Sequence, residues 1–299
     1  MSNIFEKKQN IIFIAIFYTF LWGSAFPLVK LCMEGFDISD DMSKCLLAGI
    51  RFAISGLILT AYNFVKDKKD ASPKKIELKY FISYGALATS LQYAFTYIGL
   101  SRVNGSVGAI YDQLCVFLII IFAGLFDKND KLNLKKLLGC VIGFFGVTLV
   151  STGGGEFSFS LLGDGMMILA AFCQTAAYFV ASGSAKNMSA RKLVGYGQLF
   201  GGIILTGFSL FAGGRIMTVS PIGIITLIGL SLISAIAYVL SLIPLKYFPA
   251  SEISVFNLLI TVFGVVMSAL VLGENIFKIS YLAALIFISV GIFCVNNNN

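Results

Sequence analysis

Residues 85–106 read GALATSLQYAFTYIGLSRVNGS, and residues 230–251 read LSLISAIAYVLSLIPLKYFPAS. In both places long apolar segments are cut by a short polar break, and a unit that runs from about residue 85 to residue 150 returns between residues 230 and 295. A shift of 145 positions aligns the two copies without a gap and superimposes ten identical residues out of 66. The identical pairs are Leu87 and Leu232, Tyr93 and Tyr238, Ile98 and Ile243, Leu100 and Leu245, Ser106 and Ser251, Leu114 and Leu259, Leu125 and Leu270, Leu137 and Leu282, Gly146 and Gly291, and Val150 and Val295. Apolar segments drawn from a small alphabet also agree by chance, but the kept spacing of the breaks favours a duplicated membrane unit.

The composition is that of a membrane protein. Of the 299 residues, 58% are hydrophobic and only 12% are charged, and the mean hydropathy is +0.89. Soluble domains carry about 25% charged residues, and the longest polar stretch here, residues 66–75, is too short to form a domain. We therefore expect an all-α polytopic membrane protein with no soluble domain outside its apolar segments.

A helix needs about 20 mainly apolar residues to cross the hydrocarbon core of a bilayer, and this length gives ten spans. They are residues 11–31, 44–65, 76–100, 103–125, 134–152, 161–184, 193–212, 221–245, 250–271 and 278–295. Five spans form each half, residues 10–152 and residues 160–295, and an odd number makes the second half begin at the opposite face of the membrane. The sequence thus predicts ten transmembrane helices as two inverted five-helix repeats, which place a substrate site between the halves near the midplane.

Lysine and arginine are unevenly distributed between alternate loops. If the amino terminus is cytoplasmic, 16 of the 22 basic residues lie in cytoplasmic segments, five lie outside, and Arg51 lies within a span. Basic residues gather on the cytoplasmic side of membrane proteins, so we expect a multi-pass protein of the cytoplasmic cell membrane with both termini in the cytoplasm. Because these residues occupy short loops, the net charge of +7 does not indicate nucleic-acid binding.

The chain contains six cysteines, no CxxC pair and no histidine. Metal and haem sites are typically built from clusters of these ligands. We therefore expect no metal and no other cofactor, and we interpret the cysteines as buried neutral thiols.

Two charges lie too deep in the predicted spans to belong to loops. Arg51 is about seven residues into the second span and Asp112 about nine into the fourth, which at about 1.5 Å per residue puts both roughly 10 to 14 Å from the outer face. A charge at that depth usually faces a partner or a water-filled cavity. One interpretation is a salt bridge that locks the two helices together. The other gives Asp112 a proton or a substrate ammonium to bind, with Arg51 keeping Asp112 ionised or receiving a substrate carboxylate.

Tyrosines and amides occur at about the same depth as these charges. They are Gln92, Tyr93, Tyr97, Tyr111 and Gln113 in the first half, and Gln174, Tyr178, Tyr196, Gln198, Tyr238 and Asn257 in the second. Rings bury the apolar surface of a small molecule and polar tips orient it, although amides also hold helices together and Tyr196 suits an interfacial belt. The predicted substrate-binding residues are Trp22, Arg51, Gln92, Tyr93, Tyr97, Asp112, Tyr178, Tyr238 and Asn257, with Asp112 as the candidate for proton coupling. Because Asn257 is the repeat partner of Asp112, the deep carboxylate is present in one half only, which suits a polar substrate bound off the two-fold axis.

The first span contains Trp22-Gly23-Ser24-Ala25-Phe26-Pro27 and ends in Lys30. Proline kinks a helix and small residues permit close helix contact, so kinked packing is one explanation of this motif. The motif also resembles the opening of the EamA family in the drug/metabolite transporter superfamily. The likeness continues over nearly the whole chain, at Arg51-Phe52, Gly146-Val147, Leu272-Gly273-Glu274 and Gly291-Ile292.

Two features depart from the family pattern. Members usually carry a proline within the fourth and ninth helices, whereas residues 103–125 and 250–271 contain none. The first-half counterpart of Glu274 is Asn129, which is not acidic. These differences argue against carrying a hinge or a substrate over from the family.

The resemblance implies a secondary transporter that moves a small metabolite by alternating access, exporting amino acids or related compounds across the cytoplasmic membrane. An uncoupled facilitator, or an importer of another small polar solute, is the alternative, because Asp112 is the sole deep carboxylate in the sequence. A membrane-embedded enzyme would need a clustered nucleophile and base or metal ligands, and we do not expect one. The expected partners are a small-molecule substrate and membrane lipid, and the sequence leaves a monomer and a homodimer open.

Overall fold

The computed structural model describes residues 8–66, 68–126, 133–151, 159–185, 187–247, 255–275 and 279–296. Within these ranges all regular secondary structure is helical. Six helices are long and apolar enough to cross a membrane, and shorter apolar helices accompany them. The chain is therefore a multi-pass membrane protein, as predicted.

Helices occupy each of the ten stretches predicted to be spans. In the first half they are α1 (Lys8–Gly35), α2 (Asp41–Lys66), α3 (Lys68–Ala71), η2 (Lys75–Glu77), α4 (Leu78–Gly85), η3 (Ala86–Leu91), α5 (Gln92–Leu100), α6 (Gly105–Tyr111), α7 (Leu114–Phe126) and α8 (Leu134–Ser151). In the second half they are η4 (Leu161–Gly165), α9 (Met166–Ser184), α10 (Ala190–Phe211), α11 (Pro221–Leu242), η5 (Ile243–Lys246), η6 (Val255–Asn257), α13 (Leu258–Leu272) and α14 (Ile279–Asn296). The 145-residue shift carries the bounds of α8 onto those of α14.

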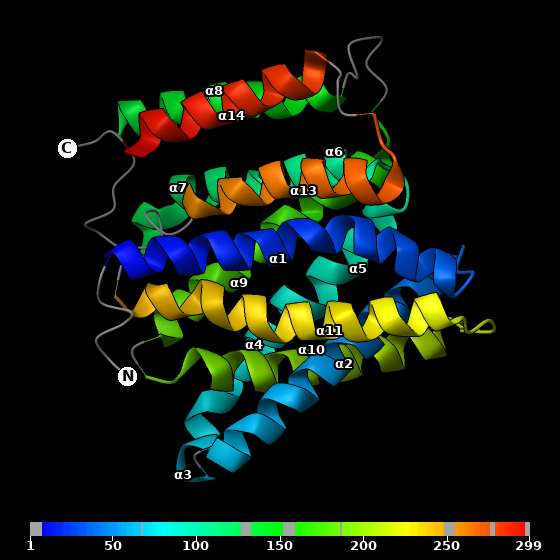
Figure 1. The fold of residues 1–299 in the computed structure, drawn as a ribbon. Helices are drawn as coiled ribbons and strands as arrows, with labels where there is room; N and C mark the ends of the chain where they lie inside the picture. The colour runs from blue at the N-terminus through cyan, green and yellow to red at the C-terminus, as the bar shows by residue number, and fades with distance from the viewer. Residues whose placement is uncertain are drawn as a thin grey trace.

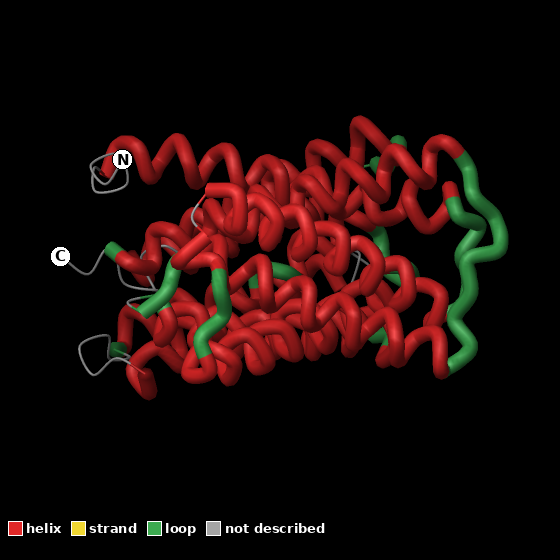
Figure 2. Tube along the Cα trace, turned by 90° about the horizontal axis from the view of Figure 1, so that it is seen from below, coloured by secondary structure: helices red, strands yellow, loops and turns green. Residues whose placement is uncertain are grey.

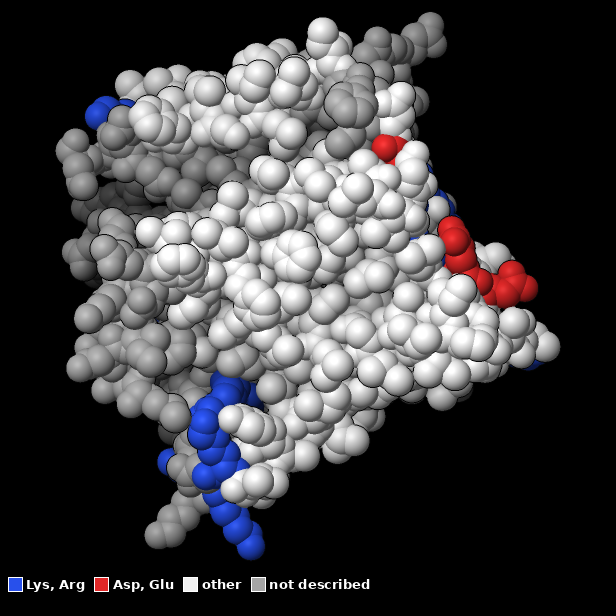
Figure 3. All heavy atoms as spheres, viewed as in Figure 1, with Lys and Arg blue, Asp and Glu red and all other residues white. Residues whose placement is uncertain are grey.

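The helices run side by side between two ends of the molecule (Figures 1 and 2), and the start of α1 and the end of α14 lie at the same end. Lysine and arginine gather at this end, around the carboxyl end of α2 and α3, and we call it the basic end (Figure 3). Acidic residues gather at the opposite end, which we call the acidic end. Between the two ends the visible surface carries uncharged side chains, as the lipid-facing surface of a membrane protein requires.

Contacts between the two halves follow a regular scheme. Helix α2 packs on α10, and α8 packs on α14. Helix α1 packs on α11 and α13, while α9, which occupies the same place in the second half, packs on α5 and α7. Each helix therefore contacts the elements that correspond to those its repeat partner contacts.

Small residues allow the closest of these contacts. A Cβ atom on Gly56 would lie 2.2 Å from the backbone nitrogen of Leu199, and one on Gly202 would lie 2.4 Å from that of Ala53. The α2 and α10 backbones therefore touch where glycine stands. Gly291 of α14 approaches the carbonyl oxygen of Gly139 in the same way, as glycine-rich faces do in membrane helices.

Two of the predicted spans are irregular at mid-length. The third contains the π-helical turn η3, between α4 and α5. The fourth is interrupted by a turn at Asp112 and Gln113, between α6 and α7. This break occurs in a span that contains no proline, although the lack of proline argued against a hinge there. Inside a membrane, irregular backbone is tolerated where protein or a cavity covers it, which directs attention to the space beside η3 and Asp112.

At the acidic end, Glu274 joins the two halves. The chain leaves α13 through Gly273, whose φ of 67° is the left-handed conformation that glycine adopts most readily. The Glu274 carboxylate then accepts hydrogen bonds from the backbone nitrogens of Gly105, at 2.8 Å, and Ser106, at 3.1 Å. An acidic side chain of the second half thus caps the first turn of α6 in the first half. The counterpart Asn129 lies outside the described residues.

Candidate functional site

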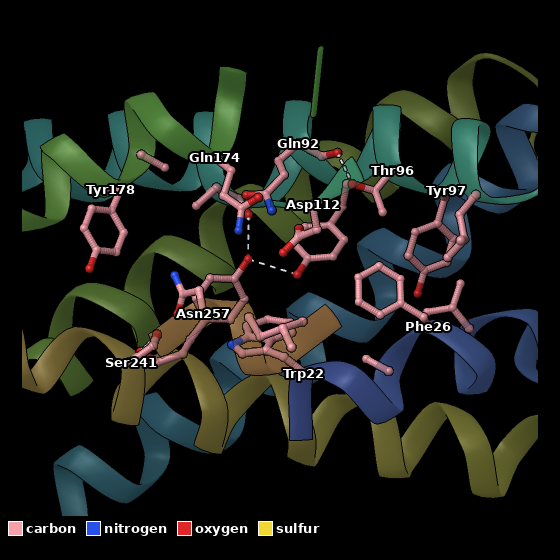
Figure 4. A pocket seen from close by; sticks show the side chains of 18 of the residues that line it. Trp22, Phe26, Gln92, Thr96, Tyr97, Asp112, Gln174, Tyr178, Ser241 and Asn257 are labelled. Carbon is pink, nitrogen blue, oxygen red and sulfur yellow. Dashed lines mark hydrogen bonds between the residues drawn. The ribbon is translucent and has the colours of Figure 1, made fainter. Parts of the chain in front are cut away.

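A central cavity of about 90 Å³ lies between the halves. Since one water-sized sphere occupies about 10 to 15 Å³ on this measure, the cavity has room for several waters or for part of a small solute. Helices α1, α2, α4, α5, α9 and α11 contribute to its wall, together with η3, η6, α13 and the turn after α6. All nine residues predicted to bind substrate line it: Trp22, Arg51, Gln92, Tyr93, Tyr97, Asp112, Tyr178, Tyr238 and Asn257. Figure 4 shows side chains from both halves converging on this space.

Arg51 projects from α2 and is almost fully buried, with 1% of its surface exposed. Its Nε donates hydrogen bonds to Ser234 Oγ at 2.9 Å and to the Leu230 carbonyl at 3.3 Å, and its Nη1 donates to Tyr97 Oη at 3.2 Å. Its Nη2 has no hydrogen-bond partner among the residues that the structure describes. The guanidinium therefore keeps unused donors beside the cavity, where an unpaired charge is costly.

Asp112 lies in the turn that ends α6, and its side chain stays partly exposed. The side chain of Gln174 approaches its carboxylate (Figure 4). The structure describes both Asp112 and Arg51, and no ion pair joins them. The salt bridge that we considered as a lock between the second and fourth helices is therefore absent, because Arg51 turns toward Ser234 and Tyr97. The two charges instead border one cavity as separate groups.

Tyr93 and Tyr238 meet at the cavity wall with their hydroxyl oxygens 3.0 Å apart. They are repeat partners under the 145-residue shift. The Tyr238 hydroxyl also donates to the Ala88 carbonyl oxygen at 3.2 Å, within the π-helical turn η3. Trp22 packs edge-on against Tyr238, with ring centroids 4.5 Å apart, so aromatic rings from both halves form one side of the cavity.

Asn257 is held by two contacts. Tyr18 Oη donates to its Oδ1 at 3.2 Å, and Gln113 Nε2 donates to its backbone oxygen at 3.1 Å. Asn257 ends the short 3₁₀ turn η6 before α13, and its repeat partner Asp112 ends α6. Both partners therefore lie where a helix is irregular and reaches the cavity.

Four polar residues that the sequence placed at this depth do not line the cavity: Tyr111, Gln113, Tyr196 and Gln198. Gln198 accepts a hydrogen bond from Ser55 at 2.5 Å and ties α10 to α2, and Tyr196 donates to the Ala71 carbonyl at 3.0 Å. Gln198 and Gln113 thus join helices, the alternative role that we gave to amides.

Several lining residues were missed, among them Phe26, Tyr84, Thr96 and Ser241. Phe26 follows Trp22 by four residues, and Thr96 follows Gln92 by four. Because residues four apart share a face of a helix, the helical period would have found both. Ser241 follows Tyr238 by three residues and is the repeat partner of Thr96, so the same period and the repeat would have found it. Tyr84 carried no comparable signal.

Within the described residues no group of histidine, cysteine, aspartate or glutamate could hold a metal ion. The cysteines are free, and Cys32, Cys45, Cys115 and Cys140 are buried. The chemistry of the cavity is therefore that of hydrogen bonds, aromatic surface and two separate charges.

Comparison with known proteins identifies the family. The sequence model of the EamA-like transporter family matches residues 9–152 and, a second time, residues 161–297. The chain belongs to this family. One solved crystal structure superposes with a TM-score of 0.72 over 97% of this chain and 99% of that chain, at 15% sequence identity, which shows a shared fold alone.

Curated relatives carry the names of transporters. An uncharacterized transporter of Haemophilus influenzae is 26% identical over 278 residues, which cover 88% of this chain and 90% of that protein. The uncharacterized transporter YdfC of Bacillus subtilis is 28% identical over 163 residues, which are 54% of this chain but only about half, 49%, of that relative. A probable amino-acid metabolite efflux pump of Escherichia coli is 25% identical over 147 residues, 48% of this chain and 43% of that protein. Family and relatives together point to a transporter rather than an enzyme.

Proposed function

We propose that this member of the EamA-like transporter family is a secondary carrier that works by alternating access through the central cavity. Its two halves, residues 10–152 and 160–295, form inverted five-helix repeats with both termini in the cytoplasm. Its substrates are amino acids or related metabolites, which it exports across the cytoplasmic membrane.

The contact between Tyr93 and Tyr238 carries this proposal. A residue lies beside its own symmetry mate only near a two-fold axis, and these repeat partners share a hydrogen bond at 3.0 Å. The axis of the duplicated fold then passes through the wall of the central cavity. In carriers built from inverted repeats, substrate binds at this interface between the halves.

Two further observations support the inverted arrangement. The helix contacts between the halves are reciprocal, with α1 on α11 and α13, and α9 on α5 and α7. The basic end carries the start of α1, the end of α14 and the lysine-rich segment around α3 (Figure 3). By the positive-inside rule this end faces the cytoplasm.

The two separate charges support an amino acid as substrate. A carboxylate can pair with both terminal nitrogens of a guanidinium, and Nη2 of Arg51 has no partner in the described part of the chain. Asp112 has no cationic partner among the described residues, so it is free to receive an ammonium group or a proton. The printed name of the Escherichia coli relative refers to an amino-acid metabolite efflux pump, which agrees with a zwitterionic substrate.

An uncoupled facilitator is the second candidate, and one observation favours it. The repeat partner of Asp112 is the uncharged Asn257, so the cavity holds a single carboxylate for substrate and proton together. A carrier that couples substrate transport to proton transport must bind the substrate and the proton at Asp112 in turn.

The test begins with a thermal-shift screen of the purified protein against metabolites, because a ligand that binds only the folded state raises the unfolding temperature. Transport of the ligand is then measured in proteoliposomes with and without a pH gradient, for wild type, Asp112→Asn and Asp164→Asn. Asp164 is a matched control, since it is buried but accepts a hydrogen bond from Ser160 outside the cavity.

We expect a pH gradient to accelerate wild type and Asp164→Asn but not Asp112→Asn. A wild type that ignores the gradient would be a facilitator. Wild-type rates and pH dependence in Asp112→Asn would make Asp112 a structural residue and remove it from the mechanism.

A further inference from the structure

A second and larger cavity opens at the basic end. Its volume is about 610 Å³, within the range of small-molecule sites. Three basic side chains line it: Lys66 at the end of α2, Arg191 in the first turn of α10, and Lys246 in η5. Ser184 and Asn187 add polar groups, and no acidic residue is among the described residues of its wall. We call this cavity the basic vestibule.

The cations of the basic vestibule lie beside tyrosine side chains, and Lys66 Nζ donates a hydrogen bond to the Tyr62 hydroxyl at 3.2 Å. Lys66 Nζ and Arg191 Cζ lie 5.6 Å and 5.9 Å from the centroid of the same ring, that of Tyr62. Lys246 Nζ lies 5.9 Å from the ring centroid of Tyr247. None of the three forms an ion pair within the described part of the chain. Like charges gathered around one tyrosine side chain repel each other, and an anion between them would remove that cost.

The basic vestibule continues into the central cavity along two helices. On α9, Ala177 lines the central cavity and Ala181, one turn further, lines the vestibule. Residues four apart share a helix face, so this face of α9 borders both spaces. On α11, Leu242 lines both cavities. The two cavities therefore lie in series, with Leu242 between them.

Beyond the vestibule, the next unpaired cation along this route is Arg51, whose Nη2 lacks a partner in the wall of the central cavity. At the acidic end, the Glu274 carboxylate ties α13 to the first turn of α6.

We propose that the basic vestibule is an anion-selective access site, which draws solutes bearing a carboxylate or phosphate group toward Arg51. The inference rests on the proposed carrier function, because it assigns a role to the route that leads to the same cavity. Cationic walls raise the local concentration of anions and their association rate, and salt weakens the effect.

The single tryptophan of the chain makes this proposal testable without knowledge of the substrate. Trp22 lines the central cavity, so quenching of its fluorescence reports which solutes arrive there. Purified protein is titrated with iodide, caesium and acrylamide, which are anionic, cationic and neutral quenchers. The variant is Lys66→Gln/Arg191→Gln/Lys246→Gln, and the control is Lys79→Gln, an exposed lysine that also lies over a tyrosine ring, that of Tyr80, but lines neither cavity.

We expect iodide to quench wild type more strongly than caesium, and the triple variant to lower the iodide quenching constant about threefold or more. Acrylamide quenching stays unchanged in the triple variant, which also shows that the variant is folded, and Lys79→Gln behaves as wild type. Equal iodide quenching in wild type and the triple variant overturns anion selection while leaving the carrier proposal intact. If no quencher reaches Trp22, both the route and the accessible cavity of the proposed carrier are wrong.

A phosphate group in the vestibule could belong to a lipid instead of a solute, and nanodiscs distinguish the two. The iodide titration is repeated in phosphatidylcholine alone and with phosphatidylglycerol added. Equal quenching by iodide in both supports a solute site. Loss of iodide but not acrylamide quenching with phosphatidylglycerol assigns the vestibule to lipid headgroups and overturns the access role.

Discussion

At the acidic end, Asp41 and Glu274 are tied to partners, whereas at the basic end Lys66, Arg191 and Lys246 surround an open cavity. Asp41 accepts two hydrogen bonds of 2.8 Å from the Arg102 guanidinium, and Glu274 caps α6. Lys66 and Arg191 at the other end have aromatic contacts and no acidic partner among the described residues. Charged side chains thus join helices at the acidic end, and three of them line a cavity at the basic end.

The comparison identifies the interactions that hold the helices together at each end. Contacts at the acidic end cross between α13 and α6, and they must break if the central cavity is to open there. At the basic end the helices are held by a different contact, a buried ion pair made by Lys192. This residue, expected in a cytoplasmic loop, is fully buried in the first turn of α10, with its Nζ 2.7 Å from the Glu77 carboxylate.

The largest expected effect is that of Lys192→Met at the basic end. The substitution leaves the Glu77 carboxylate buried without its cation, since only 7% of the Glu77 side chain is exposed. Breaking a buried pair in this way costs about 3 to 5 kcal/mol. We expect a correspondingly lower free energy of unfolding in denaturant titrations of the protein in detergent.

A second substitution separates the loss of the pair from a packing defect. In Lys192→Met/Glu77→Gln the buried charge is gone, and most of the lost stability should return. A double variant as unstable as Lys192→Met would mean that the lysine stem, and not the ion pair, fastens this end.

A smaller effect is expected for Glu274→Ala at the acidic end. The variant loses a charged cap on α6, worth about 1 to 3 kcal/mol. The outer wall of the cavity should also loosen, and a cysteine introduced at Leu100, which is buried and lines the cavity, should react faster with a thiol reagent. Unchanged reactivity of Leu100→Cys would show that Glu274 does not close this end.

The smallest effect is expected for Arg102→Gln, which serves as the control at the same end. Its pair with Asp41 is about 30% exposed on each side, and exposed ion pairs contribute about 0.2 to 1 kcal/mol. Leu100→Cys should react at the same rate with or without this change. An effect as large as that of Glu274→Ala would mean that total charge, and not the α6 cap, holds the acidic end.

The lining of the central cavity could be predicted because it depends on depth along helices. Arg51, Asp112 and Gln92 are polar or charged at a similar depth in apolar spans, and the cost of exposing such groups to lipid directs them to one interior space. The repeat supplied Tyr238 as the partner of Tyr93. Their meeting in space was beyond the sequence.

Local backbone irregularity and partner choice could not be predicted. The break at Asp112 and the π-helical turn η3 occur without proline, so no residue type announces them. Arg51 was open to an acid on the fourth helix, but Ser234 and Tyr97 lie nearer. The hydrogen-bond partners of a buried side chain depend on the distances between the packed helices. The boundaries of the spans do not specify these distances.

The most direct test of the central claim, that the two halves are inverted relative to each other, uses the repeat itself. Ser72 and Met217 are related by the 145-residue shift, and both are exposed. Ser72 directly follows α3 and Met217 lies between α10 and α11, and these two segments are at opposite ends of the molecule in Figure 1. Single cysteines at these positions, in a variant without the six native cysteines, are treated with a membrane-impermeant thiol reagent on intact cells. The account predicts labelling of Met217→Cys in intact cells and of Ser72→Cys only after permeabilisation. Labelling of both positions from the same side of the membrane would contradict it.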